Sequence, residues 1–161
     1  MSDPHHHDIH VLNSLIETTL DSADGYREAA KESDVGRYKE VFEQRSFERQ
    51  KVAGDLQGAV RTLGGDPEGD GSILAKAHRA FLDIKHALLR DERAVVDSVE
   101  TGEDFIKGKF ETALADSAVS ATTRETIRRA YDSVKSGHDQ MRDLKHSLDG
   151  QHDASNRLFP Q

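Results

Sequence analysis

The sequence predicts an all-α protein, an antiparallel four-helix bundle with a kinked or segmented third arm. Apolar residues recur at spacings of three and four along most of the chain, which is the period of an amphipathic helix. The stop signal Gly64-Gly65-Asp66-Pro67 ends one long stripe and a new stripe begins near Ser72, which predicts two antiparallel helices. No stretch shows the strict alternation of a strand, and no repeat of fixed period occurs.

The composition favours helices with two faces. Only 35% of the 161 residues are hydrophobic, 32% are charged and Trp is absent, so each helix should carry a narrow apolar stripe and a broad solvated face. The length suits one domain, which we expect over residues 9–148. A polar leader of residues 1–8 precedes it and a polar tail of residues 149–161 follows it. The histidine cluster near the start is interpreted as part of the solvated leader, with a weak surface metal site as the alternative: His5, His6, His7 and His10.

Charge and residue usage narrow the class of partner. The net charge is −8 and no dense basic block occurs, so neither nucleic acid nor an anionic membrane surface is an expected partner. The absence of cysteine excludes disulfides, thiol catalysis and thiolate metal sites. No apolar run approaches the ~20 residues that span a bilayer, and the first residues lack the layout of a signal peptide. We therefore expect a soluble cytoplasmic protein.

The first two helices are predicted over residues 8–31 and 35–63. The first carries the stripe Ile9, Leu12, Ile16, Thr19, Leu20, Ala23 and Ala30. The second is about 44 Å long at ~1.5 Å per residue, and its stripe is Tyr38, Val41, Phe42, Arg45, Glu48, Val52, Leu56, Ala59, Val60 and Leu63. Arg45 and Glu48 both fall on the inward face, three residues apart. They are expected to pair with each other within the helix.

The third arm is predicted in two pieces. A helix over residues 72–89 meets a break at Leu89-Arg90-Asp91, and a second stretch follows that is interrupted by Gly102 and Gly108. One rod of ~40 residues would outrun the second helix by about 20 Å, so we expect a kink or a break. The last helix is predicted over residues 122–148. In it, Gly137 allows close approach, and His138 borders the apolar stripe as a partly buried histidine satisfied by a neighbour.

Several short motifs carry a resemblance to a known family. They are Leu12-Asn13-Ser14-Leu15-Ile16-Glu17, Gly25-Tyr26, Leu63-Gly64-Gly65-Asp66-Pro67, Gly71-Ser72, His78-Arg79, Lys85 and Glu100-Thr101-Gly102-Glu103-Asp104. Over about residues 9–148, the chain resembles the ferritin-like four-helix-bundle proteins of unknown function that are found mainly in proteobacteria. The resemblance implies a ferritin-like fold and supplies no established activity.

Ferritin chemistry requires a particular set of ligands. A di-iron carboxylate centre usually takes one Glu from each of two helices and a Glu-x-x-His from each of the other two. The sequence contains no Glu-x-x-His. Asp-x-x-His pairs occur at Asp83/His86, Asp143/His146 and Asp149/His152, and these pairs lie off the core stripes or at the end of the chain. The complete ligand set is therefore not expected.

A metal site remains the alternative interpretation. Its candidate ligands for Fe, Mn or Zn are Glu17, Glu48, Glu100, Glu103 and His138. At 100° per residue, Glu17 points about 120° from its stripe, Glu100 points outward and Glu103 lies at the edge. Only Glu48 and His138 point inward, and two ligands do not make a dinuclear centre. A register slip at Gly25 or Gly102 would rotate Glu17 or Glu100 inward.

The sequence thus favours a non-catalytic interaction or stress-protective bundle of unknown molecular function, with no cofactor expected. The alternative is a di-iron or di-manganese carboxylate bundle resembling an oxidoreductase. A third interpretation is an oligomer with sites between chains, with Leu158-Phe159 as a small docking element, so the expected partner is a protein or a second copy. Neither a Gly-x-Ser-x-Gly elbow nor a phosphate-binding Gly-rich loop occurs.

Overall fold

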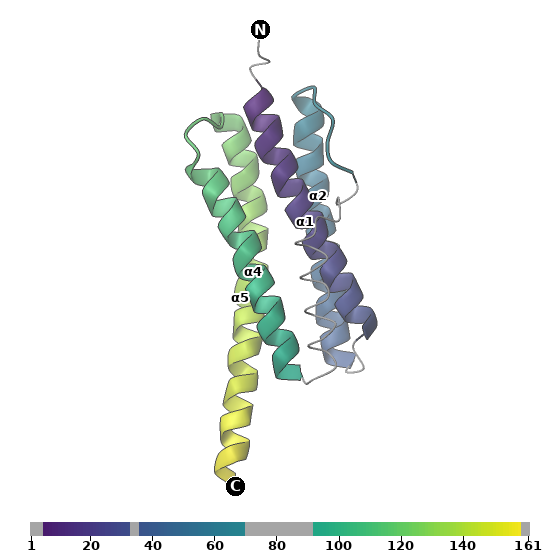
Figure 1. Ribbon diagram of the computed structural model, residues 1–161, viewed down its shortest axis with the longest axis vertical. Helices are drawn as coiled ribbons and strands as arrows, with labels where there is room; N and C mark the ends of the chain where they lie inside the picture. Colours follow the sequence, from purple (N-terminus) through teal and green to yellow (C-terminus); the bar gives the residue numbers. More distant parts are fainter. Residues whose placement is uncertain (1–4, 33–35, 70–91, 159–161) are drawn as a thin grey trace.

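In the part of the chain that the structure describes, four α-helices lie side by side in a bundle (Figure 1). The computed structural model describes residues 5–32, 36–69 and 92–158. Its helices are α1 (His6–Glu32), α2 (Gly36–Thr62), α4 (Glu92–Ala115) and α5 (Ala121–Leu158), and these ranges contain no strand. The predicted all-α four-helix class is confirmed. None of the described helices combines the length and apolarity needed to cross a membrane.

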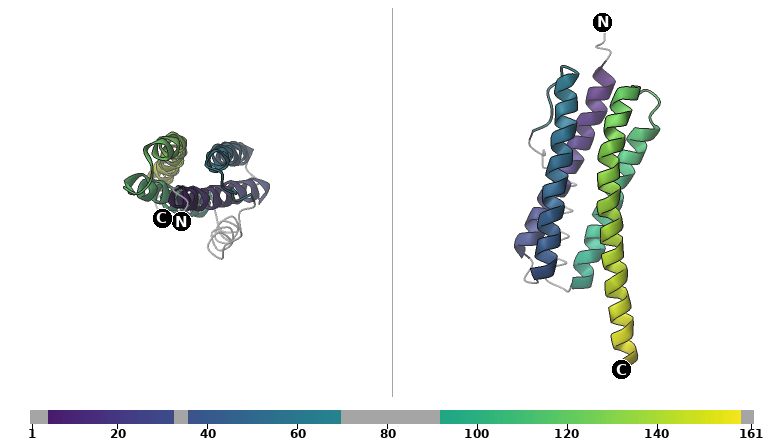
Figure 2. Two further views of the ribbon diagram at one scale, coloured as in Figure 1. Left: turned by 90° about the horizontal axis from the view of Figure 1, so that it is seen from above. Right: turned by 180° about the vertical axis from the view of Figure 1, so that it is seen from behind.

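The helices run in alternating directions around the bundle. α1 and α2 run in opposite directions, as do α4 and α5 (Figure 1). The closest packing is between α1 and α2 and between α4 and α5, while α2 meets α5 and α1 meets α4 over smaller areas. α2 and α4 run in the same direction, so a long connection joins Thr62 to Glu92 (Figure 1). Seen end-on, α2 and α5 are spread apart on one side (Figure 2).

α2 ends at the predicted stop signal. Gly64 has φ of 84°, the left-handed conformation that glycine adopts without steric cost. Its N–H donates to the carbonyl of Arg61 at 2.9 Å, and the N–H of Gly65 donates to the carbonyl of Val60 at 3.0 Å. This is the hydrogen-bond pattern of a Schellman motif. A Cβ on Gly65 would lie 2.8 Å from Ile9, so the second glycine lets the turn pack on α1.

Other helix bounds differ from the prediction. α1 begins at His6 and so includes the last residues of the expected leader. α5 continues to Leu158, through most of the expected tail, because no proline lies between Ala121 and Leu158 and Gly150 costs only about 1 kcal/mol. α4 runs unbroken through Gly102 and Gly108. The predicted helix over residues 72–89 lies outside the described residues, so the segmented third arm stays a prediction.

Asp8 of α1 joins this helix to the start of α5 at one end of the bundle. Its side chain is 3% exposed and accepts hydrogen bonds from the Ser120 backbone N–H at 3.1 Å, the Ser120 hydroxyl at 2.6 Å and the Thr123 hydroxyl at 2.9 Å. Burial raises the pKa of Asp8, but these hydrogen bonds outweigh it and hold the pKa below its ordinary value. Since α5 begins at Ala121, the carboxylate also lies at the positive end of that helix's dipole.

The apolar core is divided into two clusters. The larger cluster lies towards the Asp8 end and contains Leu12, Leu15, Ile16, Val52, Leu56, Val60, Ile106, Phe110, Ala113, Val119, Ile127, Ala130 and Val134. The smaller cluster lies towards the other end and contains Tyr26, Ala29, Ala30, Tyr38, Phe42, Val99 and Met141. On α2, α4 and α5, the residues between the two clusters include buried polar side chains.

Candidate functional site

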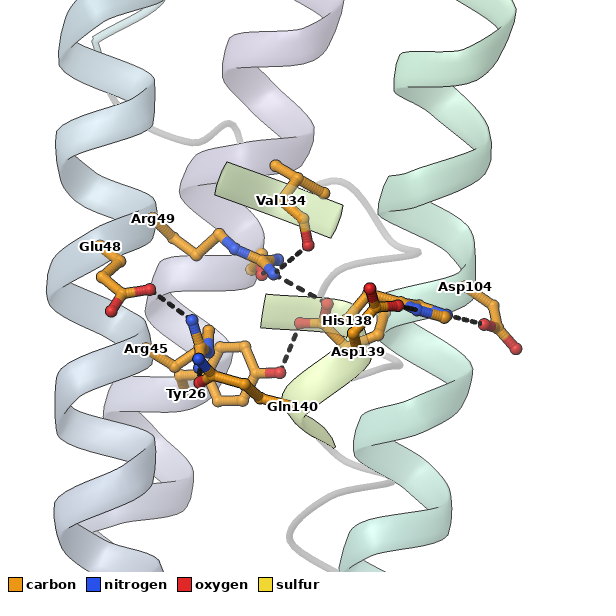
Figure 3. Close-up of polar contacts among 11 residues, drawn as sticks. Tyr26, Arg45, Glu48, Arg49, Asp104, Val134, His138, Asp139 and Gln140 are labelled. Atoms are coloured by element: carbon orange, nitrogen blue, oxygen red, sulfur yellow. Dashed lines mark hydrogen bonds and ion pairs between the residues drawn. The ribbon is translucent and has the colours of Figure 1, made fainter. Parts of the chain in front are cut away.

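Between the two apolar clusters, every helix contributes a buried polar side chain (Figure 3). These side chains, here called the arginine layer, are Tyr26 from α1, Arg45 and Arg49 from α2, Glu103 from α4 and His138 from α5. Arg49 and Glu103 are each 1% exposed and Arg45 is 2% exposed. Taking an ion out of water costs several kcal/mol unless partners replace its hydration, so the contacts of each charge decide what the layer does.

Arg49 and Glu103 form a fully buried ion pair. Nη2 of Arg49 lies 2.8 Å from Oε2 of Glu103, and Nη1 donates to the Ser22 hydroxyl at 3.0 Å. The other carboxylate oxygen, Oε1, accepts a hydrogen bond from the Tyr26 hydroxyl. Burial, followed by the nearby negative charge of Glu103, raises the pKa of Tyr26 well above its ordinary value. The phenol therefore stays protonated as a donor, and both oxygens of Glu103 are occupied.

Arg45 bridges α2 and α5. Its Nη1 contacts Oε2 of Glu48 within the helix, as the sequence predicts, and its Nη2 donates to the Gln140 side chain on α5. Glu48 itself is 35% exposed, so this carboxylate lies at the edge of the layer. Among the described residues, Nε of Arg45 is buried and has no hydrogen-bond partner. The second guanidinium is thus less completely satisfied than that of Arg49.

Gly137 makes room for both guanidiniums. A Cβ at this buried position would lie 2.7 Å from Nη2 of Arg49 and 2.9 Å from Nη1 of Arg45. Real Cβ atoms essentially never approach other atoms so closely, and both arginine ends are held by partners. The glycine predicted to allow close approach therefore does so for side chains that cross from α2, and Arg49 also reaches the Val134 carbonyl at 3.4 Å.

His138 closes the layer on the α5 side. Its Nε2 lies 2.6 Å from Oδ1 of Asp104 on α4, and its Nδ1 lies 3.4 Å from Oδ1 of Asp139 (Figure 3). Hydrogen bonds from His138 and Lys135 hold the pKa of Asp139 below its ordinary value. The side chain of His138 is 9% exposed. The prediction of a partly buried histidine satisfied by neighbours is confirmed.

The five candidate metal ligands are distributed as follows. Glu103 and His138 are buried in the arginine layer and Glu48 lies at its edge. Glu17 and Glu100 are of intermediate exposure, and each has an interaction of its own. Across residues 5–32, 36–69 and 92–158, no three His, Asp or Glu side chains gather into a group that could hold a metal ion.

One residue of the arginine layer was misplaced from the sequence and another was overlooked. Glu103 was expected at the edge of its stripe, but it is 1% exposed, and Arg49 was not singled out. A strict three–four repeat along α2 runs Phe42, Arg45, Arg49, Val52, Leu56, and along α4 it runs Val99, Glu103, Ile106, Phe110, Ala113. This repeat puts Arg49 and Glu103 in core positions. The three–four repeat could therefore have predicted that Arg49 and Glu103 are buried, provided that charged residues were counted as members of the stripe.

One comparison with known proteins identifies the family. Residues 7–116, more than half of the chain, match a family described as a domain of unknown function, DUF2383. The matched segment contains α2, α4 and all of α1 except His6, and with them Tyr26, Arg45, Arg49 and Glu103 of the arginine layer. No curated protein matches the sequence. The chain belongs to the DUF2383 family, whose function is unknown.

Proposed function

We propose that this protein is a ferritin-like helical bundle that acts without catalysis, through interaction or protection under stress. The observation that carries the proposal is the arginine layer at the middle of the bundle. There, the buried guanidinium of Arg49 is paired with the fully buried carboxylate of Glu103, and both oxygens of that carboxylate are hydrogen-bonded. The second buried guanidinium, that of Arg45, is bonded to Glu48 and Gln140. The polar groups at the middle of the bundle are therefore bonded mainly to one another, which argues against a bound cofactor between them.

The topology supports the ferritin-like part of the proposal. Up-down bundles join all neighbouring helices by short loops, whereas ferritin-like bundles contain one long crossover. Here α1 to α2 and α4 to α5 are short connections, while Thr62 and Glu92 are joined by a long one between helices that run in the same direction (Figure 1). This arrangement is the one expected of a ferritin-like chain.

A dinuclear metal centre does not fit the residues at the bundle centre. Such a centre brings several positive charges and needs carboxylates that are free to bind it. Arg45 and Arg49 already place two positive charges at this level, and Glu103 has no oxygen without a partner. Nε2 of His138 is likewise bonded to Asp104. A metal would have to displace these partners and face two guanidiniums.

The metal-binding, oxidoreductase-like bundle remains the second candidate. The observation in its favour is that Glu103 and His138, on different helices, both reach the middle of the bundle. Under this candidate they would be joined by Glu17, Glu48 and Glu100, which requires rearrangement of the ion pairs around them. Cytoplasmic localisation stays a prediction.

Metal content distinguishes the two candidates. We would replace the exposed His5 and His6 with serine to remove adventitious chelation, and keep His7 and Asp8 because they bind Asp116 and Ser120. The protein would be purified without metal-affinity resin and loaded anaerobically with Fe(II). The proposal expects less than about a tenth of an equivalent by elemental mass spectrometry, whereas about two equivalents would overturn it.

Two variants show whether any bound metal uses the bundle centre. Glu103→Gln and Glu48→Ala each remove one candidate ligand. Under the metal-binding candidate, both lose most of the Fe that the parent protein holds. Under the proposal, the metal content of both equals that of the parent, while Glu103→Gln is less stable because Arg49 has lost its buried counter-ion.

A further inference from the structure

The outer face of α2 carries an aromatic residue whose side chain is mostly exposed. Phe47 is 71% exposed, and among the described residues only Phe105 is another large apolar side chain classed as exposed. At 100° per residue, Phe47, Lys51, Gly54 and Gly58 fall within an arc of about 60° on the side of α2 opposite its buried face. We call these four residues the outer face of α2.

The outer face of α2 has open space above its two glycines. A Cβ placed on Gly54 or Gly58 would meet no atom within 4 Å. Both glycines also border a groove of about 660 Å³ between α2 and α5, and Thr126, Arg129 and Ser133 line its α5 side. Figure 2 shows α2 and α5 on the same side of the bundle, spread apart from each other. Small residues here allow another helix to approach closely.

The charges along α2 complement those of a second, antiparallel α2. Glu43 lies before Phe47, Lys51 and Asp55 lie in the middle, and Arg61 lies near the end of the helix. If two copies cross antiparallel about a point between Val52 and Ala53, residues equally far from that point face each other. Lys51 then lies within one residue, about 1.5 Å along the helix axis, of the level of Asp55 of the other copy, and Glu43 lies within one residue of the level of Arg61. In the same register, Phe47 faces Gly58.

We propose that two copies of this chain associate through the outer face of α2, as a two-fold dimer. Phe47 of each copy packs over Gly58 of the other, and Lys51 pairs with Asp55 across the axis. A closed two-fold interface uses the same patch on both copies, so one self-complementary helix face is sufficient to build it. The inference rests on the proposed interaction role and names its partner as a second copy.

The first test compares two exposed aromatic residues. Sedimentation equilibrium of the full-length chain, over a series from low to high micromolar concentration, should show a monomer–dimer equilibrium. Phe47→Glu should weaken the dimer at least about tenfold, because aromatic anchors dominate such interfaces. Phe105→Glu, on α4, is the matched control and should leave the equilibrium unchanged. A wild-type chain that stays monomeric throughout, or equal weakening by both variants, would overturn the proposal.

A charge exchange tests the register. Lys51→Glu and Asp55→Lys each put like charges across the proposed axis and should weaken the dimer, while the double variant restores opposite charges and should recover the affinity. Far-ultraviolet circular dichroism checks that each variant is folded. Failure of the double variant to recover would refute this interface. If the protein is monomeric and metal-free, the proposed dimer is wrong and the proposed function stands. If it is a dimer that binds metal, the proposed dimer stands and the proposed function is wrong.

Discussion

Replacing Glu103 with glutamine should lower the free energy of unfolding by about 3 kcal/mol, because it leaves Arg49 charged and buried. Glutamine keeps the shape of the side chain and can still accept the Tyr26 hydrogen bond, so the change removes mainly the charge. Charges about 4 Å apart at an effective dielectric constant of about 20 interact by about 4 kcal/mol. Breaking a buried ion pair typically costs about 3–5 kcal/mol. Both routes give a similar loss for a pair that is 1% exposed on each side.

A double-mutant cycle separates the pair from its surroundings. Arg49→Met alone should also cost about 3 kcal/mol, because it leaves the Glu103 carboxylate without its counter-ion. The double variant Arg49→Met/Glu103→Gln carries neither charge, so it should cost far less than the two single losses together. The expected coupling energy is therefore at least about 2 kcal/mol.

Urea denaturation followed by far-ultraviolet circular dichroism measures this cycle, since the chain has no Trp for fluorescence. The control is the same cycle on Glu125 and Arg129, an ion pair at 3.5 Å whose side chains are 54% and 78% exposed. Its coupling should be about 0.3–0.5 kcal/mol. If the Arg49–Glu103 coupling were no larger than this, the arginine layer would not be the stabilising centre that the geometry indicates.

Four further substitutions probe other positions. Gly137→Ala should destabilise the fold because the added Cβ would meet both buried guanidiniums. Gly102→Ala is the control: the added Cβ would have open space around it, so this change should stabilise the fold by about 1 kcal/mol. Equal shifts of the thermal midpoint in the two variants would contradict this reasoning. Asp8→Asn should cost about 1–3 kcal/mol at pH 7. Since the pKa of Asp8 is lowered on folding, that difference in urea stability should shrink as the pH falls below about 3.9, and a pH-independent difference would exclude the role of its charge. Burial, then Glu17 and Asp24, raise the pKa of Asp21 to about 6, so ionised Asp21 opposes folding above that pH. Asp21→Asn should therefore raise stability at pH 7 by about 1 kcal/mol after allowance for solvent screening, with no gain near pH 4.

Much of the architecture could be predicted because it depends on local signals. The periodic stripes gave α1 and α2 nearly at their observed bounds, and Gly64-Gly65 ends α2 with a hydrogen-bond pattern that few other residue pairs allow. The end of α5 was missed by ten residues. A single glycine in a polar segment weakens a helix without stopping it, and no local signal reports its continuation.

The arginine layer could be predicted only in part. Arg45 with Glu48 and the satisfied His138 were found, because each involves neighbours on one helix or a position on a stripe. The pairing of Arg49 with Glu103 joins residues 54 apart in the sequence. A charged residue on an apolar stripe has no local partner to reveal it, so its pairing depends on which helices are adjacent and in what register.

The same layer removes an ambiguity inherent in a three–four stripe. Such a stripe repeats every heptad, so sliding α5 along α2 by about 10 Å would again set apolar side chains against apolar side chains. At the level of the two guanidiniums, however, the sequence of α5 provides one glycine, Gly137, while the positions seven residues away are Ala130 and Leu144. Either of these would bring a Cβ into the space that the guanidiniums occupy. Of the registers that the apolar stripe alone would allow between α2 and α5, only the one that places Gly137 beside the two guanidiniums avoids this clash.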